Sequence, residues 1–349
     1  MDKKRIAVIF GGCSTEYEVS LQSAHAVITH LDKELFDVVM IGITRDGRWL
    51  HYNGNLDKLL NNTWFYDASC VKAILSPDRR DKGLLEIAED SISLIKLDAV
   101  FPVLHGKNGE DGTLQGLIEL SGIPLVGCGT LSSALCMDKD LAHKIVYMAG
   151  IKTPSSVIIR KDMEKNLICR LTNVLTFPVF VKPVKSGSSF GITKVLREDD
   201  LWEAVEAAFI HDDKVIIEEN IEGFEVGCAI LGNEQLIVGE VDEIELTQGF
   251  FDFTEKYTLK SSTIHMPARI NHELAHQVKE TAKTIYQELG CKGFARVDMF
   301  LTPNGDLVFN EVNTIPGFTS HSRYPNMLKG IGFDYSRILK ELIYLAIKD

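Results

Sequence analysis

The stretch from Phe294 to Arg323 reads FARVDMFLTPNGDLVFNEVNTIPGFTSHSR. Apolar side chains occupy every second position from Ala295 to Leu301, which is the period of a β-strand. The pair Asn304-Gly305 follows as the strongest short signal for a hairpin turn. A second apolar segment then runs from Leu307 to Asn313. The stretch therefore predicts a β-hairpin followed by a loop.

One face of this hairpin carries an unusual set of polar side chains. If the Asn-Gly pair forms a two-residue turn, Asp298 lies opposite Glu311 and Arg296 lies opposite Asn313, all on the same face. The two carboxylates would then repel each other unless a cation lay between them. Because Mg²⁺ prefers oxygen ligands and usually also takes substrate phosphates, the pattern predicts a magnesium site for phosphoryl transfer. The alternative is a solvated hairpin face with ordinary ion pairs.

Composition limits the class of protein. The chain has 349 residues, of which 45% are hydrophobic and 25% charged, so we expect an ordinary globular protein with two or three domains. Its net charge of -12 argues against general nucleic-acid binding. The seven cysteines form no C-x-x-C pair, which is typical of reduced thiols in a cytoplasmic protein. No apolar run is long enough for a signal peptide or a membrane span, so we expect no membrane partner.

The segment 1–137 has an α/β pattern. The strand Ile6–Phe10 ends in two glycines, and Glu16 is expected in the first turn of the next helix, where the dipole favours a carboxylate. His105 lies at the end of a later predicted strand. It could contact a ligand there, or it could be a structural histidine. These features predict a doubly wound sheet with ligands at the strand carboxyl ends. The fingerprint G-x-G-x-x-G is absent, so no nicotinamide cofactor is expected. Residues 53–94 show no clear pattern.

The segment 138–220 combines two lysines with a small-residue loop. Lys139 lies on a predicted helix, and Lys182 lies near the end of a predicted strand. The loop Ser186–Gly191 could offer backbone N–H groups to phosphates, although it is not a Walker A motif and flexible Gly/Ser hairpins are common. A later strand ends in acidic residues that include Glu218. These could accept hydrogen bonds from a nucleotide or could simply be solvated.

The segment 221–349 contains a long irregular loop. After two predicted strands, the chain from Thr247 to Met266 is aromatic and polar, and it includes Lys256 and Tyr257. A loop of this length inside a compact domain is usually functional, often as a lid. A helix at 271–289 then leads into the hairpin.

These features together resemble the ATP-grasp ligases: a strand with a lysine, a Gly/Ser lid, an acidic strand end and an R-x-D…N-E-x-N hairpin. Over nearly the whole chain the sequence resembles the D-alanine–D-alanine ligase family, and within it the vancomycin-resistance D-alanine–D-serine ligases of the VanG type. The similarity continues through four stretches: Gly11–Ser20, His105–Gly116, Met137–Lys139 and Asn313–Ser322.

The resemblance implies an α/β ATP-grasp ligase with an N-terminal doubly wound α/β domain (1–137). A central ATP-grasp domain (138–220) and a C-terminal ATP-grasp domain with an omega loop and the metal hairpin (221–349) would follow. The implied reaction joins D-alanine to D-serine through a D-alanyl phosphate, in a cytoplasmic homodimer, and supports vancomycin resistance. ATP and two Mg²⁺ ions, or Mn²⁺, would be the cofactors. The alternative is a D-alanine–D-alanine ligase of cell-wall synthesis.

Two other classes are possible. A different ATP-grasp enzyme, such as a carboxylase, predicts a biotin or bicarbonate partner, and nothing in the sequence suggests one. A nucleotide-binding module without catalysis predicts the loss of at least one polar residue of the hairpin. All four are present: Arg296, Asp298, Glu311 and Asn313.

The resemblance also implies roles for individual residues. Two lysines would hold the phosphates under the lid, two glutamates would hold the adenine amino group and the ribose, and the omega loop would exclude water. The implied catalytic residues are Glu16, which holds the D-alanine ammonium in a network with Ser188 and Tyr257, together with His105, Lys256, Arg296 and Gly317. The implied ATP contacts are Lys139, Lys182, Ser186, Ser188, Ser189, Glu218, Glu219, Ile221, Glu225, Phe300 and Asn310. The implied metal ligands are Asp298, Glu311 and Asn313.

The second amino acid would bind near the end of the quoted stretch, with its carboxylate at Ser322. Members of the family that are specific for D-alanine carry leucine and tyrosine where this chain has Arg323 and Phe251. Arg323 brings five N–H donors that a methyl group cannot use. Asp242 is the candidate for orienting it through a bidentate pair. A D-serine hydroxyl is therefore the expected partner, unless Arg323 is a solvated surface residue.

Overall fold

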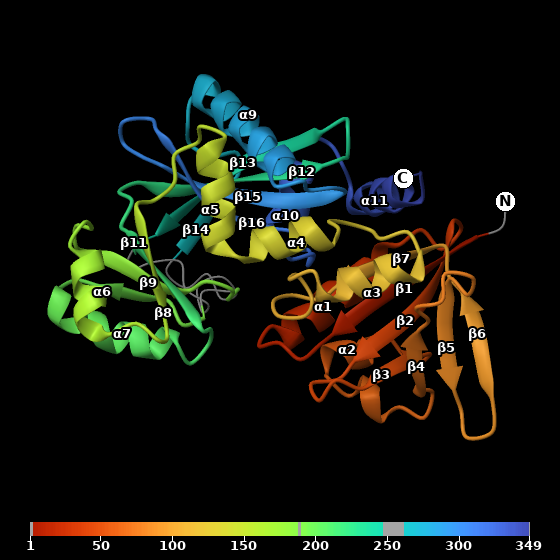
Figure 1. The fold of residues 1–349 in the computed structure, drawn as a ribbon. Helices are drawn as coiled ribbons and strands as arrows, with labels where there is room; N and C mark the ends of the chain where they lie inside the picture. The colour runs from red at the N-terminus through yellow and green to blue at the C-terminus, as the bar shows by residue number, and fades with distance from the viewer. Residues whose placement is uncertain (1–2, 188–189, 247–261, 349) are drawn as a thin grey trace.

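The computed structural model describes residues 3–187, 190–246 and 262–348, which form three β-sheets with helices packed on them (Figure 1). The first sheet has seven strands in the order β6-β5-β4-β3-β2-β1-β7. Its strands are β1 (Lys4–Gly11), β2 (Phe36–Ile43), β3 (Trp49–Tyr52), β4 (Val71–Leu75), β5 (Gly83–Ile87), β6 (Ile92–Lys96) and β7 (Ala99–Val103).

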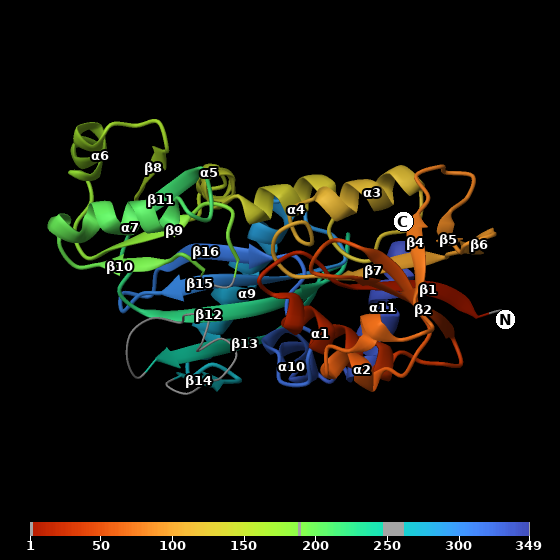
Figure 2. The same cartoon turned by 90° about the horizontal axis from the view of Figure 1, so that it is seen from below.

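Strands β2, β1 and β7 are parallel, and β3 to β6 extend the sheet with antiparallel pairs. The region 53–94, which shows no clear pattern in the sequence, supplies β4 to β6 of this extension. Helices α1 (Tyr17–His30) and α3 (Thr113–Ser121) cover opposite faces of β1, which explains why that strand is almost continuously apolar (Figure 2). Shorter helical segments are α2 (Asp57–Leu60) and η1 (Trp64–Tyr66).

The second sheet has four strands in the order β10-β9-β11-β8. Helices α6 (Lys165–Thr172) and α7 (Leu201–Ala208) pack on its apolar face, and η2 (Glu198–Asp200) precedes α7. The opposite face carries Phe180, Lys182 and Glu218, because side chains alternate along each strand. The strands are β8 (Ser156–Arg160), β9 (Val179–Pro183), β10 (Thr193–Val195) and β11 (Lys214–Glu219).

The third sheet has five antiparallel strands in the order β14-β13-β12-β15-β16. Helix α9 (His272–Glu288) packs on its apolar face. The end of the segment Thr247–Met266, which was expected to be irregular, instead forms β14 along β13, and its first part lies outside the described residues. The strands are β12 (Phe224–Leu231), β13 (Ile237–Leu246), β14 (Ser262–His265), β15 (Phe294–Leu301) and β16 (Leu307–Asn313).

The register of the β15–β16 hairpin is the one that the sequence predicts at its polar end. Arg296 pairs with Asn313, and Asp298 pairs with Glu311. The four side chains therefore lie on neighbouring rungs of one face.

The predicted two-residue turn is nevertheless wrong. Leu301 pairs with Leu307, so the connection is longer than two residues, and Gly305 takes a positive φ of 84° within it. The register then shifts next to Asp298, where Asn310 is an extra residue of β16 and forms a bulge. The bulge compensates for the longer turn and restores the expected pairing at the polar end.

The remaining helices connect the sheets. Helices α4 (Thr130–Met137) and α5 (Lys139–Met148) lead from the first sheet to the second, and α10 (Arg323–Lys329) follows the hairpin. The last helix, α11 (Tyr335–Lys348), returns to the first sheet and shares its core with α1 (Figure 1). Among the described residues, no helix could cross a membrane. All seven cysteines are free, as the sequence predicts.

Candidate active site

A pocket of about 370 Å³ lies between the polar faces of the four-stranded and five-stranded sheets. Every expected nucleotide contact within the described part of the chain lines this pocket. These residues are Lys139, Lys182, Ser186, Glu218, Glu219, Ile221, Glu225, Phe300 and Asn310, and Glu311 of the hairpin joins them. The sequence therefore predicts which segments meet, although they are far apart along the chain.

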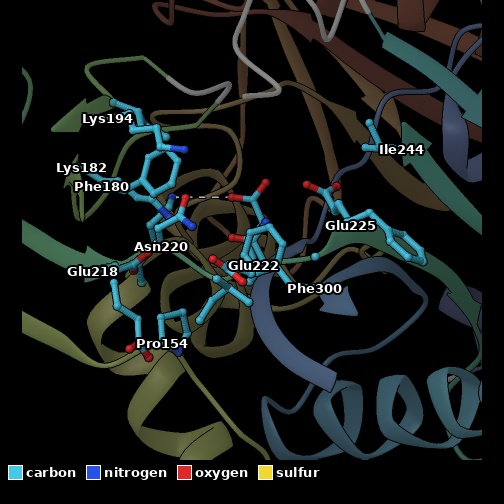
Figure 3. A pocket seen from close by; sticks show the side chains of 18 of the residues that line it. Pro154, Phe180, Lys182, Lys194, Glu218, Asn220, Glu222, Glu225, Ile244 and Phe300 are labelled. Carbon is cyan, nitrogen blue, oxygen red and sulfur yellow. Dashed lines mark hydrogen bonds and ion pairs between the residues drawn. The ribbon is translucent and has the colours of Figure 1, made fainter. Parts of the chain in front are cut away.

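Phe180 and Lys194 are among the lining residues of this pocket that the sequence analysis missed. Phe180 precedes Lys182 by two positions, and Lys194 is its cross-strand partner on β10. The ammonium groups of Lys182 and Lys194 lie 5.7 Å and 5.5 Å from the centre of the Phe180 ring (Figure 3). The two-residue period of a strand, counted back from Lys182, was the signal that could have found Phe180.

Glu218 is a buried carboxylate at one end of the pocket. Burial alone would raise the pKa of Glu218, but the charge of Lys182 lowers it below its usual value, so the group is ionised. Its Oε2 pairs with Lys182, while its Oε1 has no hydrogen-bond partner among the described residues. A buried acceptor without a partner is costly, so this oxygen fits a donor that enters from the pocket.

Lys139 connects Ser186 to the β15–β16 hairpin. It is the first residue of α5, after the N-cap Asp138, whose carboxylate accepts from the backbone N–H of Leu141. The ammonium group of Lys139 donates to the carbonyl of Ser186 at 2.9 Å and lies 3.7 Å from Oε2 of Glu311. A cation thus lies between Ser186 and the hairpin carboxylate Glu311.

The pair of Asp298 and Glu311 is part of a longer row of cross-strand partners in the sheet. Across β13, β12, β15 and β16, the cross-strand partners in this row are Asp242, Gly227, Asp298 and Glu311. Arg296 donates two parallel hydrogen bonds to Asp298, at 2.8 Å and 2.7 Å.

These contacts correct one step of the sequence argument. Asn313 donates to the carboxylate of Asp298 at 3.0 Å, in addition to Arg296. The protein's own donors therefore compensate Asp298, and its closeness to Glu311 does not by itself require a metal ion.

Arg323 is buried, so it is not a surface arginine. Its Nε and Nη2 donate to the two carboxylate oxygens of Asp242 at 2.7 Å and 2.8 Å, in the bidentate pair that the sequence predicts. Its Nη2 also lies 3.3 Å from Asp298. Burial opposes the charge on Arg323, but Asp242 and then Asp298 raise its pKa well above the usual value. A Cβ at Gly227 would lie 2.2 Å from this guanidinium, so only glycine fits beneath it.

Glu225 has a second contact that the sequence did not indicate. Its Oε1 accepts from Nη1 of Arg323 at 2.8 Å, while the residue also lines the pocket between the two sheets (Figure 3). Glu225 therefore connects this pocket to the arginine expected at the second amino-acid site.

Glu16 lies where the N-terminal loop meets the backbone at Gly187. It is the N-cap residue of α1, rather than a first-turn residue as expected from the sequence. The structure buries it, and Cβ atoms added to Gly106 and Gly187 would lie 2.5 Å and 2.9 Å from its Oε2. Its carboxylate is therefore packed against the backbone of both loops.

Glu110 is a buried carboxyl that the sequence analysis missed. Its two oxygens accept from the backbone N–H groups of Gly106 and Ile315, so it joins the N-terminal loop to the loop after the hairpin. Burial, and then the nearby charge of Glu16, raise the pKa of Glu110 to about 8. It also lines a small cavity of about 30 Å³ that reaches Glu311. Its place in a glycine-rich loop at a strand end was the available signal.

His105 lies behind the loop that carries Gly317. Its Nδ1 donates to the carbonyl of Ile315 at 2.9 Å, and its Nε2 lies 3.1 Å from the hydroxyl of Ser23. That hydroxyl also accepts from the backbone N–H of Phe318 at 3.3 Å. Burial lowers the pKa of His105, so the ring is neutral. His105 thus supports this loop and lines neither of the two cavities described above.

Two expected site residues lie side by side beyond the hairpin. Ser322 is the N-cap residue of α10, and its hydroxyl accepts from the backbone N–H of Thr319 at 2.9 Å. A Cβ at Gly317 would lie 2.9 Å from that hydroxyl. The remaining expected site residues lie outside the described part of the chain: Ser188, Ser189, Phe251, Lys256 and Tyr257.

Comparison with known proteins gives consistent results. Two family descriptions match: "D-ala D-ala ligase N-terminus" over residues 5–128 and "D-ala D-ala ligase C-terminus" over residues 145–344. The crystal structure of the VanG D-Ala:D-Ser ligase from Enterococcus faecalis has a TM-score of 0.92 and is 61% identical, over 99% of this chain and 100% of that chain.

Curated relatives match over similar lengths. The vancomycin B-type resistance protein VanB of Enterococcus faecalis is 47% identical over 100% of both chains. The D-alanine–D-alanine ligase of Caldicellulosiruptor bescii is 44% identical over 100% of this chain and 96% of that protein. These matches also confirm the α/β ATP-grasp fold that the sequence predicts. The chain therefore belongs to the D-alanine–D-alanine ligase family of ADP-forming ligases.

Proposed function

We propose that this chain joins D-alanine to D-serine through a D-alanyl phosphate, and that the dipeptide enters an altered peptidoglycan precursor that confers vancomycin resistance. The similarity to a VanG D-Ala:D-Ser ligase supports this substrate pair. The observation that carries the proposal is the buried guanidinium of Arg323, which Asp242 holds beside the metal hairpin. A D-serine hydroxyl can accept from a guanidinium, whereas a D-alanine methyl group cannot.

We assign ATP to the pocket between the two sheets. Its size, the unpartnered Oε1 of Glu218 and the lysines around Phe180 support this assignment. Lys139 and Lys182 would hold the phosphates under the lid. Glu218 would accept from the adenine amino group, and Glu225 would divide its carboxylate between the ribose and Arg323.

We assign Mg²⁺, with Mn²⁺ as a possible substitute, to Asp298, Glu311 and Asn313. Carboxylate and amide oxygens on neighbouring rungs suit a hard cation. Within the described ranges, no three His, Cys, Asp or Glu side chains are grouped to hold a metal ion. Phosphate oxygens would therefore complete the coordination of the two ions that we propose. When bound, they would neutralise charge on the phosphoryl group during its transfer.

The first D-alanine would lie between the N-terminal loop and the hairpin. Glu16 would hold its ammonium group, and His105 would support the loop whose Gly317 N–H binds the developing oxyanion. Arg296 would stabilise the transferred phosphoryl group. Lys256 and Tyr257, on the proposed omega loop, would help exclude water from the D-alanyl phosphate.

The second amino acid would attack as the free amine, with its carboxylate at Ser322 and its side chain toward Arg323. Phe251, which has no hydroxyl, would leave space for the D-serine hydroxyl. We further propose that the enzyme acts as a homodimer in the cytoplasm, where ATP is available.

A D-alanine–D-alanine ligase remains the alternative, because a protein of that name is 44% identical to this chain. The two functions differ in the second substrate. We expect ADP release with D-alanine and D-serine together, and a kcat/KM for D-serine at the second site at least about tenfold above that for D-alanine, because the site pairs a hydroxyl. An equal or higher value for D-alanine would contradict the proposal.

A separate prediction concerns protons. D-alanine binding should release a proton at pH 7. Glu110 has a pKa of about 8 in the free protein, so it is mostly protonated at this pH. The ammonium group of D-alanine, bound beside Glu110 and Glu16, would favour the ionised form of Glu110. The release should decline as the pH rises above 8, where free Glu110 is already ionised. Titration calorimetry in HEPES and in Tris, whose ionisation enthalpies differ, measures the release. Identical heats in both buffers at pH 7 would contradict this prediction, and a smaller difference between the two buffers at about pH 8.5, where D-alanine is still an ammonium ion, is the control.

A further inference from the structure

His143 lies one helical turn after Lys139 on α5 and is 5% exposed. Its Nε2 is 3.2 Å from the carbonyl oxygen of Asn310, the bulge residue of the metal hairpin. Its Nδ1 is 3.7 Å from Oε1 of Glu218. The imidazole therefore lies between the carboxylate assigned to the adenine and the strand assigned to the metal.

The contact between His143 and Glu218 is not a hydrogen bond. A distance of 3.7 Å is too long for one, and a bridging water would hold the two atoms about 4.5 to 5 Å apart. Both atoms are buried, and neither has another hydrogen-bond partner in the described part of the chain. Leaving such atoms unpaired usually costs about 1 to 3 kcal/mol, so the arrangement needs an explanation.

The protonation of His143 provides one. Burial lowers the pKa of His143. The charge of Glu218 opposes this shift, whereas the charges of Lys182 and Lys139 lower the pKa further. The ring is therefore neutral at pH 7. Because Nε2 donates its proton to the carbonyl of Asn310, Nδ1 carries only a lone pair. The histidine therefore places no donor against Glu218, and Oε1 keeps its full capacity as an acceptor.

We propose that His143 is a positioning residue for the choice of base: it binds the hairpin bulge through Nε2 and leaves Oε1 of Glu218 available to the adenine amino group. This inference depends on the proposed use of ATP. It explains why a buried carboxylate has an unpartnered oxygen, and it predicts discrimination against inosine triphosphate. Inosine carries a carbonyl oxygen where adenosine has the amino group, and that oxygen would meet the carboxylate as a second acceptor.

Two amide substitutions separate the two nitrogens of the ring. In His143→Gln the amide nitrogen reaches the position of Nε2, so the bond to Asn310 is kept and Glu218 gains no donor. In His143→Asn the amide nitrogen lies near Nδ1, so Glu218 gains a donor and the bond to Asn310 is lost. We expect His143→Asn to raise the KM for ATP about tenfold and to reduce the ATP to ITP preference about tenfold, with kcat within about twofold. We expect His143→Gln to restore both values to within about twofold of the parent.

Steady-state ADP release with D-alanine and D-serine measures these values, and thermal melting checks the fold of each variant. Equal effects of the two substitutions on KM and on base preference would overturn the inference, because a packing role does not distinguish the two nitrogens. If His143→Asn does not fold, ¹⁵N spectra of the histidines in the nucleotide-free parent decide instead. A neutral ring with the proton on Nε2 is expected, and a charged ring or a proton on Nδ1 would overturn the inference. A parent that shows no ATP-dependent turnover would refute the proposed function first, so the two failures can be told apart.

Discussion

Replacing Glu311 by Gln will lower ATP turnover by roughly 100-fold or more while the protein stays folded. The substitution keeps the shape of the side chain but removes the charge that we assign to the metal. Glu311 is only partly buried, and the ammonium group of Lys139, 3.7 Å from its carboxylate, keeps its hydrogen bond to the carbonyl of Ser186 in the variant. ADP release at saturating ATP, D-alanine and D-serine measures the effect, and circular dichroism with thermal melting tests the fold.

Asp298 would be a poorer choice for this test. It is 1% exposed and accepts from Arg296 and Asn313, so its replacement would disturb the whole polar face. Glu222→Gln is the matched control, because Glu222 is an exposed acidic residue of the same pocket and has no assigned role at the metal. Near-normal turnover in Glu311→Gln, with an unchanged melting temperature, would contradict the metal assignment. Equal losses in Glu311→Gln and Glu222→Gln would contradict it too, since only a general charge effect would remain.

The β15–β16 hairpin shows how much of a local structure a sequence pattern can predict. The alternation around Asp298 fixes which side chains share a face, and the structure confirms the pairing with Glu311. The turn was nevertheless predicted too short. The bulge at Asn310 compensates for the longer turn, so the pairing at the polar end is unchanged. No local sequence pattern predicts this bulge, because its position depends on which side chains pack in the core and in the pocket.

Contacts between segments far apart in the sequence were predicted less completely. The bidentate pair of Asp242 and Arg323 was expected from their chemistry, but its position above Gly227 follows from the register of three strands. Glu110 and His143 were missed, because each acts through atoms that only the folded chain brings close. The residues next to Glu110 in the sequence do not indicate that its carboxyl will be buried and will join two loops.

The second large effect concerns the choice of the second amino acid. Arg323→Leu should reduce the ratio of kcat/KM for D-serine to that for D-alanine about 100-fold, because the site then has no donor for the hydroxyl. The same substitution leaves Asp242, which is 0% exposed, without its cation. An unpaired buried charge costs about 3 to 5 kcal/mol, so a large loss of stability is also expected.

The double variant Asp242→Asn/Arg323→Leu separates specificity from folding. Asn has nearly the shape of Asp but no charge, so the double variant should regain much of the stability that Arg323→Leu loses. Its ratio of D-serine to D-alanine should nevertheless stay as low as that of the single variant, because neither protein has a guanidinium at this site. The ratio is taken within one enzyme, so a general loss of activity through the contact of Arg323 with Asp298 cancels. A ratio that returns to the parent value in the double variant would show that the single substitution acted through misfolding and that Arg323 does not select D-serine.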